Sequence, residues 1–282
     1  MKILLVGSSS SLGKALLPVL SEFGEVVTAG RKNCEITIDL GNPFLNYKLP
    51  DNIDVAIHTA ANFGGKADDE IFEAEVVNGL GTLKLCQAAV QAKVKHFILI
   101  STIFVNLNED SEFYNVYALS KRHAEDLAIL YCKYHSLPLT ILRPSQIYGI
   151  EDLYRKHQPF LYSIVDKAQN GESVTINGSH DPLRNFIYIN DLTTIIAKVI
   201  QKRVVGKYSC TQTMDVKFSE IVKAAFTAFN REANVLFLND KADIPDNIFE
   251  KDDFLYKLIN FYPQISIVEG MKKIANYRKS IS

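Results

Sequence analysis

One pair of side chains in this sequence has the types and the spacing needed to move a proton. Tyr117 and Lys121 stand four residues apart in the run Tyr-Ala-Leu-Ser-Lys, the only Tyr-x-x-x-Lys in the chain. Side chains four residues apart lie on one face of a helix. A free tyrosine has a pKa of about 10, and a nearby ammonium lowers that pKa by favouring the phenolate. We therefore predict that Tyr117 is an acid–base group whose pKa Lys121 brings toward the working pH.

A hydroxyl group precedes this pair at the end of an apolar run. Ser101 and Thr102 follow the run Phe97–Ile100, and a hydroxyl there can donate a hydrogen bond to a substrate carbonyl. Taken alone, Thr102 is equally well explained as an ordinary residue at the end of a strand. Together with Tyr117 and Lys121 it completes a predicted catalytic group of three residues.

A loop rich in glycine and serine lies between the first apolar run and the first helical stretch. The loop sequence GSSSSLG (7–13) permits a tight turn, and the helix that follows offers unpaired N–H groups to a pyrophosphate. A serine stands where a dinucleotide-binding loop has its central glycine, and such turns also occur for steric reasons alone. The position of this loop, between the first strand and the first helix, favours dinucleotide binding. The contacts are expected from Gly7, Ser9, Ser10, Ser11, Leu12 and Gly13.

The residues after the second strand bear on which dinucleotide is bound. An acidic residue there accepts the ribose 2′-hydroxyl of NAD, whereas an arginine suits the 2′-phosphate of NADP. This chain has Arg31 and Lys32 at that position and no acid. NADP is therefore predicted ahead of NAD, with a solvated basic turn as the alternative. Asp39, beside Leu40 at the end of the third strand, is expected either to accept a hydrogen bond from the adenine amine or to cap the following turn.

Short apolar runs that alternate with helical stretches position these residues. Runs of this length, bounded by turn residues or charge, are typical of strands buried on both faces. Their alternation with amphipathic helices predicts an α/β fold, a Rossmann-like doubly wound parallel sheet, over about the first 150 residues. The apolar runs are Ile3–Val6, Val26–Thr28, Val55–His58, Phe97–Ile100 and Leu139–Leu142, and the helical stretches are Leu12–Phe23, Ala74–Ala92 and Tyr117–Tyr134.

The pattern changes after Gly149, where strand and helix signals are mixed. This change predicts a smaller C-terminal α/β part that binds substrate. We assign residues 1–150 to an NAD(P)-binding Rossmann domain, to which residues 186–200 are expected to return. Residues 151–185 and 201–282 are assigned to the substrate-binding part.

Composition and charge exclude several classes of protein. The 282 residues are 47% hydrophobic and 22% charged with a net charge of −1, which excludes a disordered chain and gives no basic surface for nucleic acid or an anionic membrane. No apolar run reaches the roughly 18 residues of a membrane span, and no signal peptide is recognisable. Four separated cysteines are typical of reduced thiols, and six histidines share no ligand spacing. We therefore expect a cytoplasmic protein without a metal ion.

Further motifs give the chain a resemblance to a known family. The motifs are HTAA at 58–61, NGLGT at 78–82, LRPSQIYG at 142–149 and RNFIYIND at 184–191. Together with the glycine-serine loop and the Tyr–Lys pair, they resemble the extended short-chain dehydrogenase/reductases, in the group of nucleotide-sugar epimerases, dehydratases and reductases. The likeness spans nearly the whole chain, and the order of its motifs is specific.

The resemblance implies roles for individual residues. It implies that Tyr117 donates or accepts the proton, that Lys121 holds the nicotinamide ribose, and that Thr102 orients the reacting oxygen. Arg184 matches the arginine that grips the diphosphate of a sugar nucleotide, with a surface ion pair as the alternative. The resemblance further implies cofactor contacts from Thr59, Ala60, Ala61, Asn78 and Pro144, and substrate contacts from Asn62, Thr102 and Gln146, where a glutamine replaces the family's usual asparagine.

Three reactions share this scaffold in the family that the chain resembles. Its dehydratases follow the catalytic threonine with an Asp-Glu pair, whereas Ile103 and Phe104 follow Thr102 here and cannot transfer protons. The Arg31 turn and the short chain favour an NADPH-dependent reductase of a 4-keto-6-deoxysugar nucleotide, with Tyr117 as the proton donor. An NAD-dependent nucleotide-sugar 4-epimerase is the alternative. A non-catalytic NADP-sensing regulator is a third reading, which the retained Tyr–Lys pair disfavours.

The resemblance also implies a homodimer. In the family, the helix that carries the tyrosine and the helix before the fifth strand commonly pack against their copies as a four-helix bundle. The stretch Ala74–Ala92 carries more apolar residues than one contact with a sheet requires. We expect this surplus to lie in a subunit interface.

Overall fold

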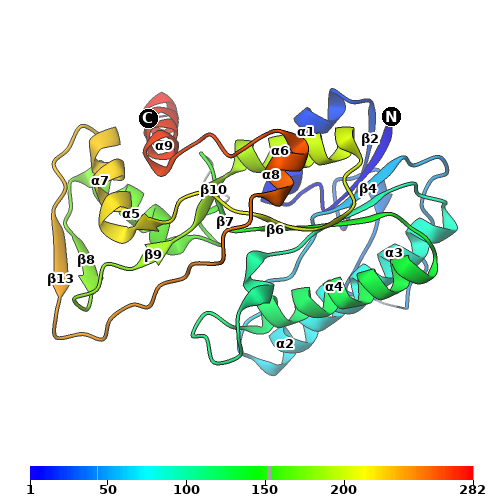
Figure 1. The fold of residues 1–282 in the computed structure, drawn as a ribbon, viewed down its shortest axis with the longest axis horizontal. Helices are drawn as coiled ribbons and strands as arrows, with labels where there is room; N and C mark the ends of the chain where they lie inside the picture. Colours follow the sequence, from blue (N-terminus) through cyan, green and yellow to red (C-terminus); the bar gives the residue numbers. More distant parts are fainter. Residues whose placement is uncertain (43, 151–153, 282) are drawn as a thin grey trace. The chain divides into compact units, whose positions relative to one another are not determined.

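Two compact units make up the chain (Figure 1). The computed structural model describes residues 1–42, 44–150 and 154–281. The first unit comprises Met1–Pro144, Thr193–Cys210 and Phe254–Asn260, and the second comprises Ser145–Leu192, Thr211–Asp253 and the chain from Phe261 onward. The return expected at 186–200 begins later, at Thr193, and extends to Cys210. Phe254–Asn260, which the sequence analysis assigned to the other part, also belongs to the first unit. The functional division into cofactor and substrate domains stays a prediction.

A seven-stranded parallel sheet forms the centre of the first unit, in the order β11-β6-β5-β4-β1-β2-β3. Leu4 on β1 pairs with Val27 on one side and with Ala56 on the other. The order of the strands reverses between β1 and β4, and ligands of open parallel sheets bind at the carboxyl ends of the strands beside such a point. The predicted Rossmann-like fold is thus confirmed. The strands are β1 (Lys2–Val6), β2 (Glu25–Gly30), β3 (Ile36–Thr37), β4 (Val55–His58), β5 (Phe97–Ile100), β6 (Leu139–Pro144) and β11 (Gly206–Cys210).

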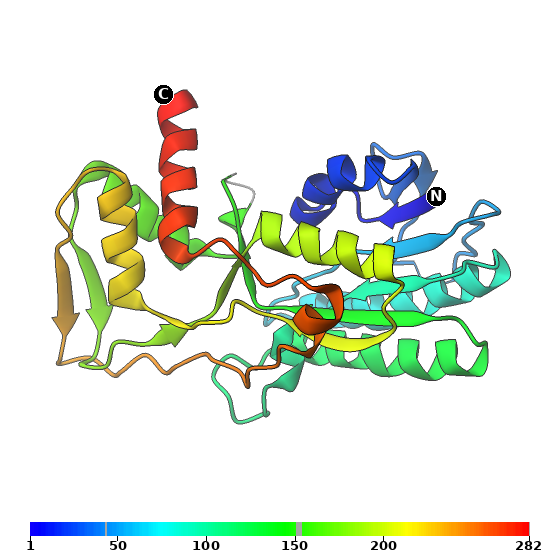
Figure 2. The same cartoon turned by 45° about the horizontal axis from the view of Figure 1, so that its top comes forward.

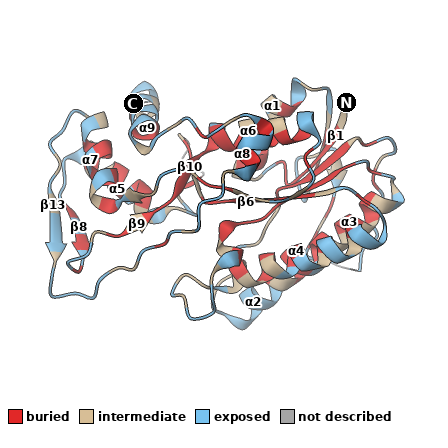
Figure 3. Cartoon of the chain, in the orientation of Figure 1, coloured by how far each residue is buried: buried red, intermediate tan, exposed pale blue. Residues whose placement is uncertain are grey.

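Helices cover both faces of this sheet (Figure 2). The helices α1 (Ser11–Ser21) and α6 (Ile189–Lys202, in this unit from Thr193) cover one face, and α3 (Gly81–Gln91) and α4 (Val116–Tyr134) cover the other. The short helix α8 (Phe254–Ile259) packs beside β11. Leu4 and Val6 share a buried core with Leu85 on α3 and Ala128 on α4. The central strands β4 and β5 are buried at every residue, and β1 is buried at every residue but its first (Figure 3). Burial on both faces explains why the central strands β1 and β5 are almost entirely apolar.

The stretch expected as one helix over 74–92 is divided into three parts. The structure has α2 (Asp68–Ala74), a π-helical segment η1 (Glu75–Leu80) and then α3. π-Helical turns are rare and are frequent at functional sites. In this segment the Asn78 amide bonds the backbone of Asn62 and the hydroxyl of Ser120. These hydrogen bonds join the π-helical segment to residues far away in the sequence. The apolar periodicity of the stretch therefore could not predict them.

The second unit is a smaller α/β arrangement of three two-stranded sheets and three helices among its described residues. The helix α7 packs against both α5 and α9. The C-terminal α/β part is therefore confirmed as a fold, while its binding of substrate stays a prediction. The strand pairs are β7 (Gln146–Tyr148) with β10 (Phe186–Tyr188), β8 (Val174–Asn177) with β13 (Val235–Leu238), and β9 (Leu183–Arg184) with β12 (Val216–Lys217), and the helices are α5 (Pro159–Asn170), α7 (Phe218–Ala228) and α9 (Ile267–Ile281).

No helix in the described parts of the chain has the length and apolar character to span a membrane.

Candidate active site

Two close backbone approaches shape the loop after β1. Gly7 has a φ of +88°, and a Cβ on it would lie 2.5 Å from the backbone nitrogen of Ala60. A Cβ on Gly13 would overlap the carbonyl oxygen of Gly7. Ser10 caps α1, because its Oγ accepts a hydrogen bond from the N–H of Gly13 at 2.9 Å. The serine that replaces the central glycine therefore stabilises the start of the helix.

Thr59 fastens the same loop to the sheet. Its Oγ1 lies 3.0 Å from the carbonyl oxygens of both Val6 and Gly7, and 3.2 Å from Ser10 Oγ. The loop, its close-packed glycines and the N-terminus of α1 form a cradle that suits a negatively charged pyrophosphate. The residues present therefore fit an NAD(P) dinucleotide at this position.

The residues expected near the adenosine end follow β2 and β3. Arg31 and Lys32 are both exposed. Asp39 Oδ1 accepts a hydrogen bond from Gly41 N at 3.1 Å, and the Tyr47 hydroxyl donates to the Asp39 carbonyl. Of the two roles expected for Asp39, the structure shows the capping of the turn, and contact with adenine stays a prediction.

Asn78 is engaged within the protein. Its side chain is almost fully buried, and its amide donates to the Asn62 carbonyl at 2.7 Å and to Ser120 Oγ at 2.8 Å. Its Oδ1 accepts from Asn62 N at 2.8 Å, while Asn62 Oδ1 accepts from Gly64 N at 2.7 Å. Both amide hydrogens of Asn78 are thus used in bridging the loop after β4 to α4. A direct contact between Asn78 and the cofactor stays a prediction.

The three predicted catalytic residues all lie in the first unit, after β5 and at the start of α4. Thr102 is the N-cap of the short turn η2 (Ile103–Asn106). Asn115 caps α4, so that Tyr117 and Lys121 fall in its first two turns. Lys121 is 1% exposed, and its Nζ donates to the Ile100 carbonyl at 2.7 Å. Lys121 therefore reaches from its helix to the carboxyl end of β5.

Burial governs the ionisation of this pair. Burial raises the pKa of Tyr117. Burial also lowers the pKa of Lys121 to about 8, against the opposing effect of Glu125. The predicted lowering of the Tyr117 pKa is therefore wrong for this structure, because burial disfavours the charged phenolate. At neutral pH Tyr117 carries its proton, as a proton donor must.

Phe63 is a neighbour of the tyrosine that the sequence analysis missed. Its ring stacks on that of Tyr117, with centroids 4.5 Å apart and planes 18° apart. Phe63 is 45% exposed, so its outer side faces solvent. The contact fixes one face of the tyrosine ring. No spacing rule in the sequence joins a loop residue to a helix 54 positions later, so no signal was available.

The other two predicted substrate residues, Gln146 and Arg184, line a cavity of about 280 Å³ within the second unit. Gln146 Nε2 donates to Gln158 Oε1 at 3.0 Å. Gln146 Oε1 is buried and has no hydrogen-bond partner among the described residues. An orphaned buried acceptor suits a hydrogen-bond donor on a ligand. The aromatic wall of the cavity is a stacked pair, Phe160 and Phe218, with centroids 4.2 Å apart.

Arg184 is held in place by its surroundings. Its guanidinium carbon lies 4.7 Å from the centroid of Phe218, and its Nη1 donates to the carbonyls of Leu183 and Pro245 at 2.8 Å each. Burial lowers the pKa of Arg184 to about 10, so the group keeps its charge at neutral pH. A surface ion pair does not describe this buried side chain. Its predicted contact with a diphosphate stays a prediction.

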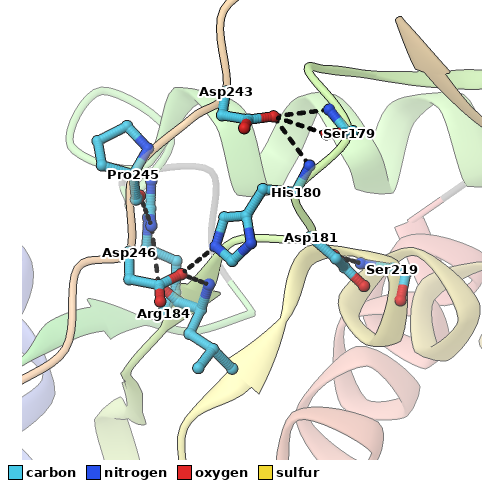
Figure 4. Close-up of polar contacts among 9 residues, drawn as sticks. Ser179, His180, Asp181, Arg184, Ser219, Asp243, Pro245 and Asp246 are labelled. Carbon is cyan, nitrogen blue, oxygen red and sulfur yellow. Dashed lines mark hydrogen bonds and ion pairs between the residues drawn. The ribbon is translucent and has the colours of Figure 1, made fainter. Parts of the chain in front are cut away.

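Two aspartates pin the segment after β13 beside Arg184 (Figure 4). Asp246 Oδ1 accepts from Leu183 N at 2.7 Å and lies 2.7 Å from His180 Nε2. Asp243 Oδ1 accepts from His180 N at 2.9 Å. These bonds hold Ile244, which lines the cavity, between two fixed points. Two aspartates three residues apart carry no signal in the sequence that would reveal this role.

His, Cys, Asp and Glu side chains are the potential metal ligands of the described part of the chain. Among the described residues, no three His, Cys, Asp or Glu side chains gather as ligands for a metal ion. All four cysteines are free thiols, and Cys86, Cys132 and Cys210 are buried.

The sheet and its phosphate cradle define the class of protein, a dinucleotide-binding α/β enzyme. The model of the NAD dependent epimerase/dehydratase family matches residues 3–210. The chain belongs to this family. The resemblance inferred from the motifs is therefore confirmed, and so is the prediction of an NAD(P)-dependent enzyme.

Relatives and solved structures agree with this placement. The dTDP-D-glucose 4,6-dehydratase of Homo sapiens is 28% identical over 249 residues, which cover 82% of this chain and 70% of the human protein. The UDP-N-acetylglucosamine 4-epimerase of Bacillus cereus superposes with a TM-score of 0.81 at 19% identity, covering 100% and 98% of the two chains. RMD from Pseudomonas aeruginosa, solved with NADPH, gives a TM-score of 0.79 at 19% identity and covers 100% and 99%. At these identities the structures show a shared fold.

Proposed function

We propose that the protein is an NADPH-dependent reductase that converts the carbonyl of a 4-keto-6-deoxysugar nucleotide into a hydroxyl. The observation that carries the proposal is the placement of Thr102, Tyr117 and Lys121 after β5 and on the first turns of α4. At neutral pH Tyr117 carries its proton, and this is the form that a proton donor to the carbonyl oxygen needs.

Each of the three residues has one task in this reaction. A dihydronicotinamide cofactor, when bound, would supply the hydride that the carbonyl carbon receives. Tyr117 gives its phenolic proton to the carbonyl oxygen, which stays on the carbon as the hydroxyl of the product, and Tyr117 regains a proton from solvent. Thr102 donates a hydrogen bond to the same oxygen and so orients it. The Lys121 ammonium stabilises the transient phenolate and bonds the ribose of the cofactor.

The basic turn after β2 supports NADPH over NADH. Arg31 and Lys32 are exposed at the position where an NAD site has an acid. A guanidinium bonds a phosphate through two parallel N–H groups.

The residues after Thr102 argue against a dehydratase. Ile103 is 1% exposed and Phe104 follows it in η2. Elimination of water needs an acid and a base at the sugar, and neither side chain ionises. The reaction named for the human relative is therefore not proposed for this chain.

A nucleotide-sugar 4-epimerase is the second candidate. It would use the same Thr102, Tyr117 and Lys121 but return the hydride to the opposite face of the same sugar. The Bacillus cereus 4-epimerase, with a TM-score of 0.81, supports it at the level of the fold. Net consumption of cofactor separates the two reactions, because an epimerase consumes none.

The experiment combines the purified protein with a 4-keto-6-deoxysugar nucleotide and either NADPH or NADH. Oxidation of the nicotinamide is followed by absorbance, and the product is followed by mass spectrometry. We expect one NADPH to be oxidised for each sugar reduced, and NADH to react more slowly. Interconversion of 4-hydroxy sugar nucleotides without cofactor consumption would favour the epimerase. Bound NADP without either activity would favour a regulator.

We further propose a cytoplasmic homodimer with an interface on η1 and α4. Large apolar side chains on these elements are exposed in the first unit, although most apolar residues of the unit are buried. Contiguous exposed apolar residues are typical of protein interfaces. These residues are Leu80, Ile129, Leu130 and Tyr134, which are 45%, 39%, 49% and 72% exposed.

A further inference from the structure

The surroundings of Lys121 extend beyond the three proposed catalytic residues. Glu125 lies four residues after Lys121 on α4, continuing the spacing that starts at Tyr117. Its side chain is 2% exposed. A carboxylate removed from water requires a partner of opposite charge and hydrogen bonds. Arg143, near the end of β6, supplies both.

Arg143 joins two elements of the site. Its Nε donates to Glu125 Oε1 at 2.8 Å and its Nη2 to Glu125 Oε2 at 2.5 Å. Its Nη1 donates to Asn106 Oδ1 at 2.9 Å. Asn106 ends the turn η2 that Thr102 begins. A chain of hydrogen bonds thus connects the helix of Lys121 with the turn of Thr102.

A second arginine connects the same two elements. Arg122, next to Lys121 on α4, donates from Nε to the Val105 carbonyl at 3.0 Å and from Nη2 to the Leu107 carbonyl at 2.6 Å. The helix and the turn are therefore fixed to each other at two points. Movement of Lys121 relative to Thr102 would break bonds at both.

Glu125 also acts on the charge of Lys121. Burial lowers the pKa of Lys121 to about 8, and the carboxylate of Glu125 raises it. His58 on β4 is buried, and both its burial and the charge of Lys121 lower its pKa to about 3, so it is neutral. Tyr117 is neutral because burial raises its pKa. Glu125, one helical turn after Lys121, is the charged group whose field acts on Lys121, and Arg143 on β6 is the cation bound to Glu125.

We propose that Glu125, held by Arg143, is a positioning residue that keeps Lys121 charged and fixes its helix to the turn of Thr102. This inference rests on the proposed function, which gives Lys121 its catalytic task. Glu125 acts through Lys121 and touches neither substrate nor cofactor in this scheme.

The test measures the ionisation of Lys121 in the full chain. Lysine labelled with carbon-13 at Cε gives one signal for each lysine, and the Lys121→Met variant identifies the signal of Lys121 by its loss. Glu125→Gln keeps the shape of the side chain, removes its charge and leaves the cation of Arg143. We expect the pKa of Lys121 to fall by about one unit or more. The alkaline limb of the pH–activity profile should move to lower pH by the same amount.

Two further variants test the sign and the specificity of the effect. Arg143→Met removes the positive charge, so the pKa of Lys121 should hold or rise, and a fall would contradict the proposal. Glu125→Asp keeps the charge, so the pKa of Lys121 should fall by less in this variant than in Glu125→Gln. As a matched control, Lys95→Gln breaks the exposed ion pair with Asp54 and should leave the Lys121 titration unchanged.

Other outcomes overturn the proposal. Loosened packing would admit water and raise the pKa of Lys121 toward its ordinary value in both charge variants. If the pKa of Lys121 rises or stays the same in Glu125→Gln, the role of Glu125 is purely structural. The same conclusion follows if Lys95→Gln shifts the pKa of Lys121 by as much as Glu125→Gln does. Because this titration uses no substrate, the proposal can fail while the reductase assay succeeds, and the reverse.

Discussion

Arg31 is the residue on which the choice of cofactor depends. It stands exposed after β2, where its guanidinium can bond a 2′-phosphate. Arg31→Ala should weaken the binding of NADPH by about 1.5–3 kcal/mol, the size of a lost charge-assisted contact, and leave NADH nearly unchanged. Fluorescence titration of both cofactors measures the difference. Equal affinity of the wild-type protein for NADPH and NADH would contradict the assignment of NADP.

The Tyr–Lys pair shows what a sequence reveals about single residues. The four-residue spacing located Tyr117 and Lys121 on one helix, and the structure places them there. The spacing did not reveal the ionisation of Tyr117, because desolvation depends on which distant segments cover the hydroxyl. The stacking of Phe63 was missed for the same reason. Glu125 could have been predicted from the sequence, because it continues the four-residue spacing of Tyr117 and Lys121.

At the scale of elements, the start of α1 depends on one side chain. Ser10 Oγ accepts from Gly13 N and contacts Thr59 Oγ1. Ser10→Ala should lower the free energy of unfolding by about 1 kcal/mol, the usual value of a helix N-cap. Urea denaturation measures it. Ser21→Ala, which removes an exposed hydroxyl bonded to the Leu17 carbonyl, should change stability by no more than about 0.5 kcal/mol. Equal losses in the two variants would contradict a special role for Ser10.

The strands and helices differ in how well the sequence predicts them. Runs such as Ile3–Val6 are apolar on both faces, and this property identified the buried parallel strands. The two-residue strands β3, β9 and β12 are too short for any periodicity. β3 pairs with the nearby β2, and β9 pairs with β12 about 30 residues later. The π-helical segment η1 was missed, because apolar spacing fixes which face is buried but not the width of a turn.

At the scale of the molecule, a buried histidine makes stability depend on pH. His96 Nε2 lies 2.7 Å from Thr140 Oγ1, and burial lowers the pKa of His96 to about 4 from 6.5. Between these values the unfolded chain binds a proton that the folded chain does not. The contribution of the neutral His96 to the free energy of unfolding is therefore complete above pH 6.5, and it is lost as the pH falls toward 4.

This reasoning gives a stability prediction. Lowering the pH from about 7 to about 5 should cost on the order of 1–2 kcal/mol through His96. Urea denaturation at both values measures the loss, which should be smaller in His96→Gln. His58 titrates lower still, to about 3, and leaves a residual dependence in the variant. An unchanged pH dependence in His96→Gln would show that His96 does not contribute.

The assembly of the molecule is a further prediction at this scale. Leu130 is 49% exposed on α4, within the proposed subunit interface. Light scattering at micromolar concentration should give the mass of a dimer for the wild-type chain and that of a monomer for Leu130→Glu, because a charge is costly in an apolar interface. Circular dichroism checks that the variant is folded. A monomer in the wild-type protein would contradict the interface.

The division of the chain was the least predictable feature of the molecule. The sequence indicated a change of pattern near residue 149, and the first segment of the first unit ends at Pro144. It did not indicate that Phe254–Asn260 belongs to the first unit. It also did not indicate that β11 pairs with β6 at the edge of the sheet. These features arise from contacts between distant segments, which local composition does not record.

The central claim is that Tyr117 donates the proton in reduction of a sugar carbonyl. Turnover of a 4-keto-6-deoxysugar nucleotide with NADPH by the Tyr117→Phe variant tests it most directly. This change removes one oxygen and keeps the ring that stacks on Phe63. Turnover should fall by about 10²–10⁴-fold, the usual contribution of a positioned proton donor. Lys121→Met should lose less activity but bind the cofactor more weakly, and Thr102→Val should lose least. A folded Tyr117→Phe protein that works at the wild-type rate would contradict the claim.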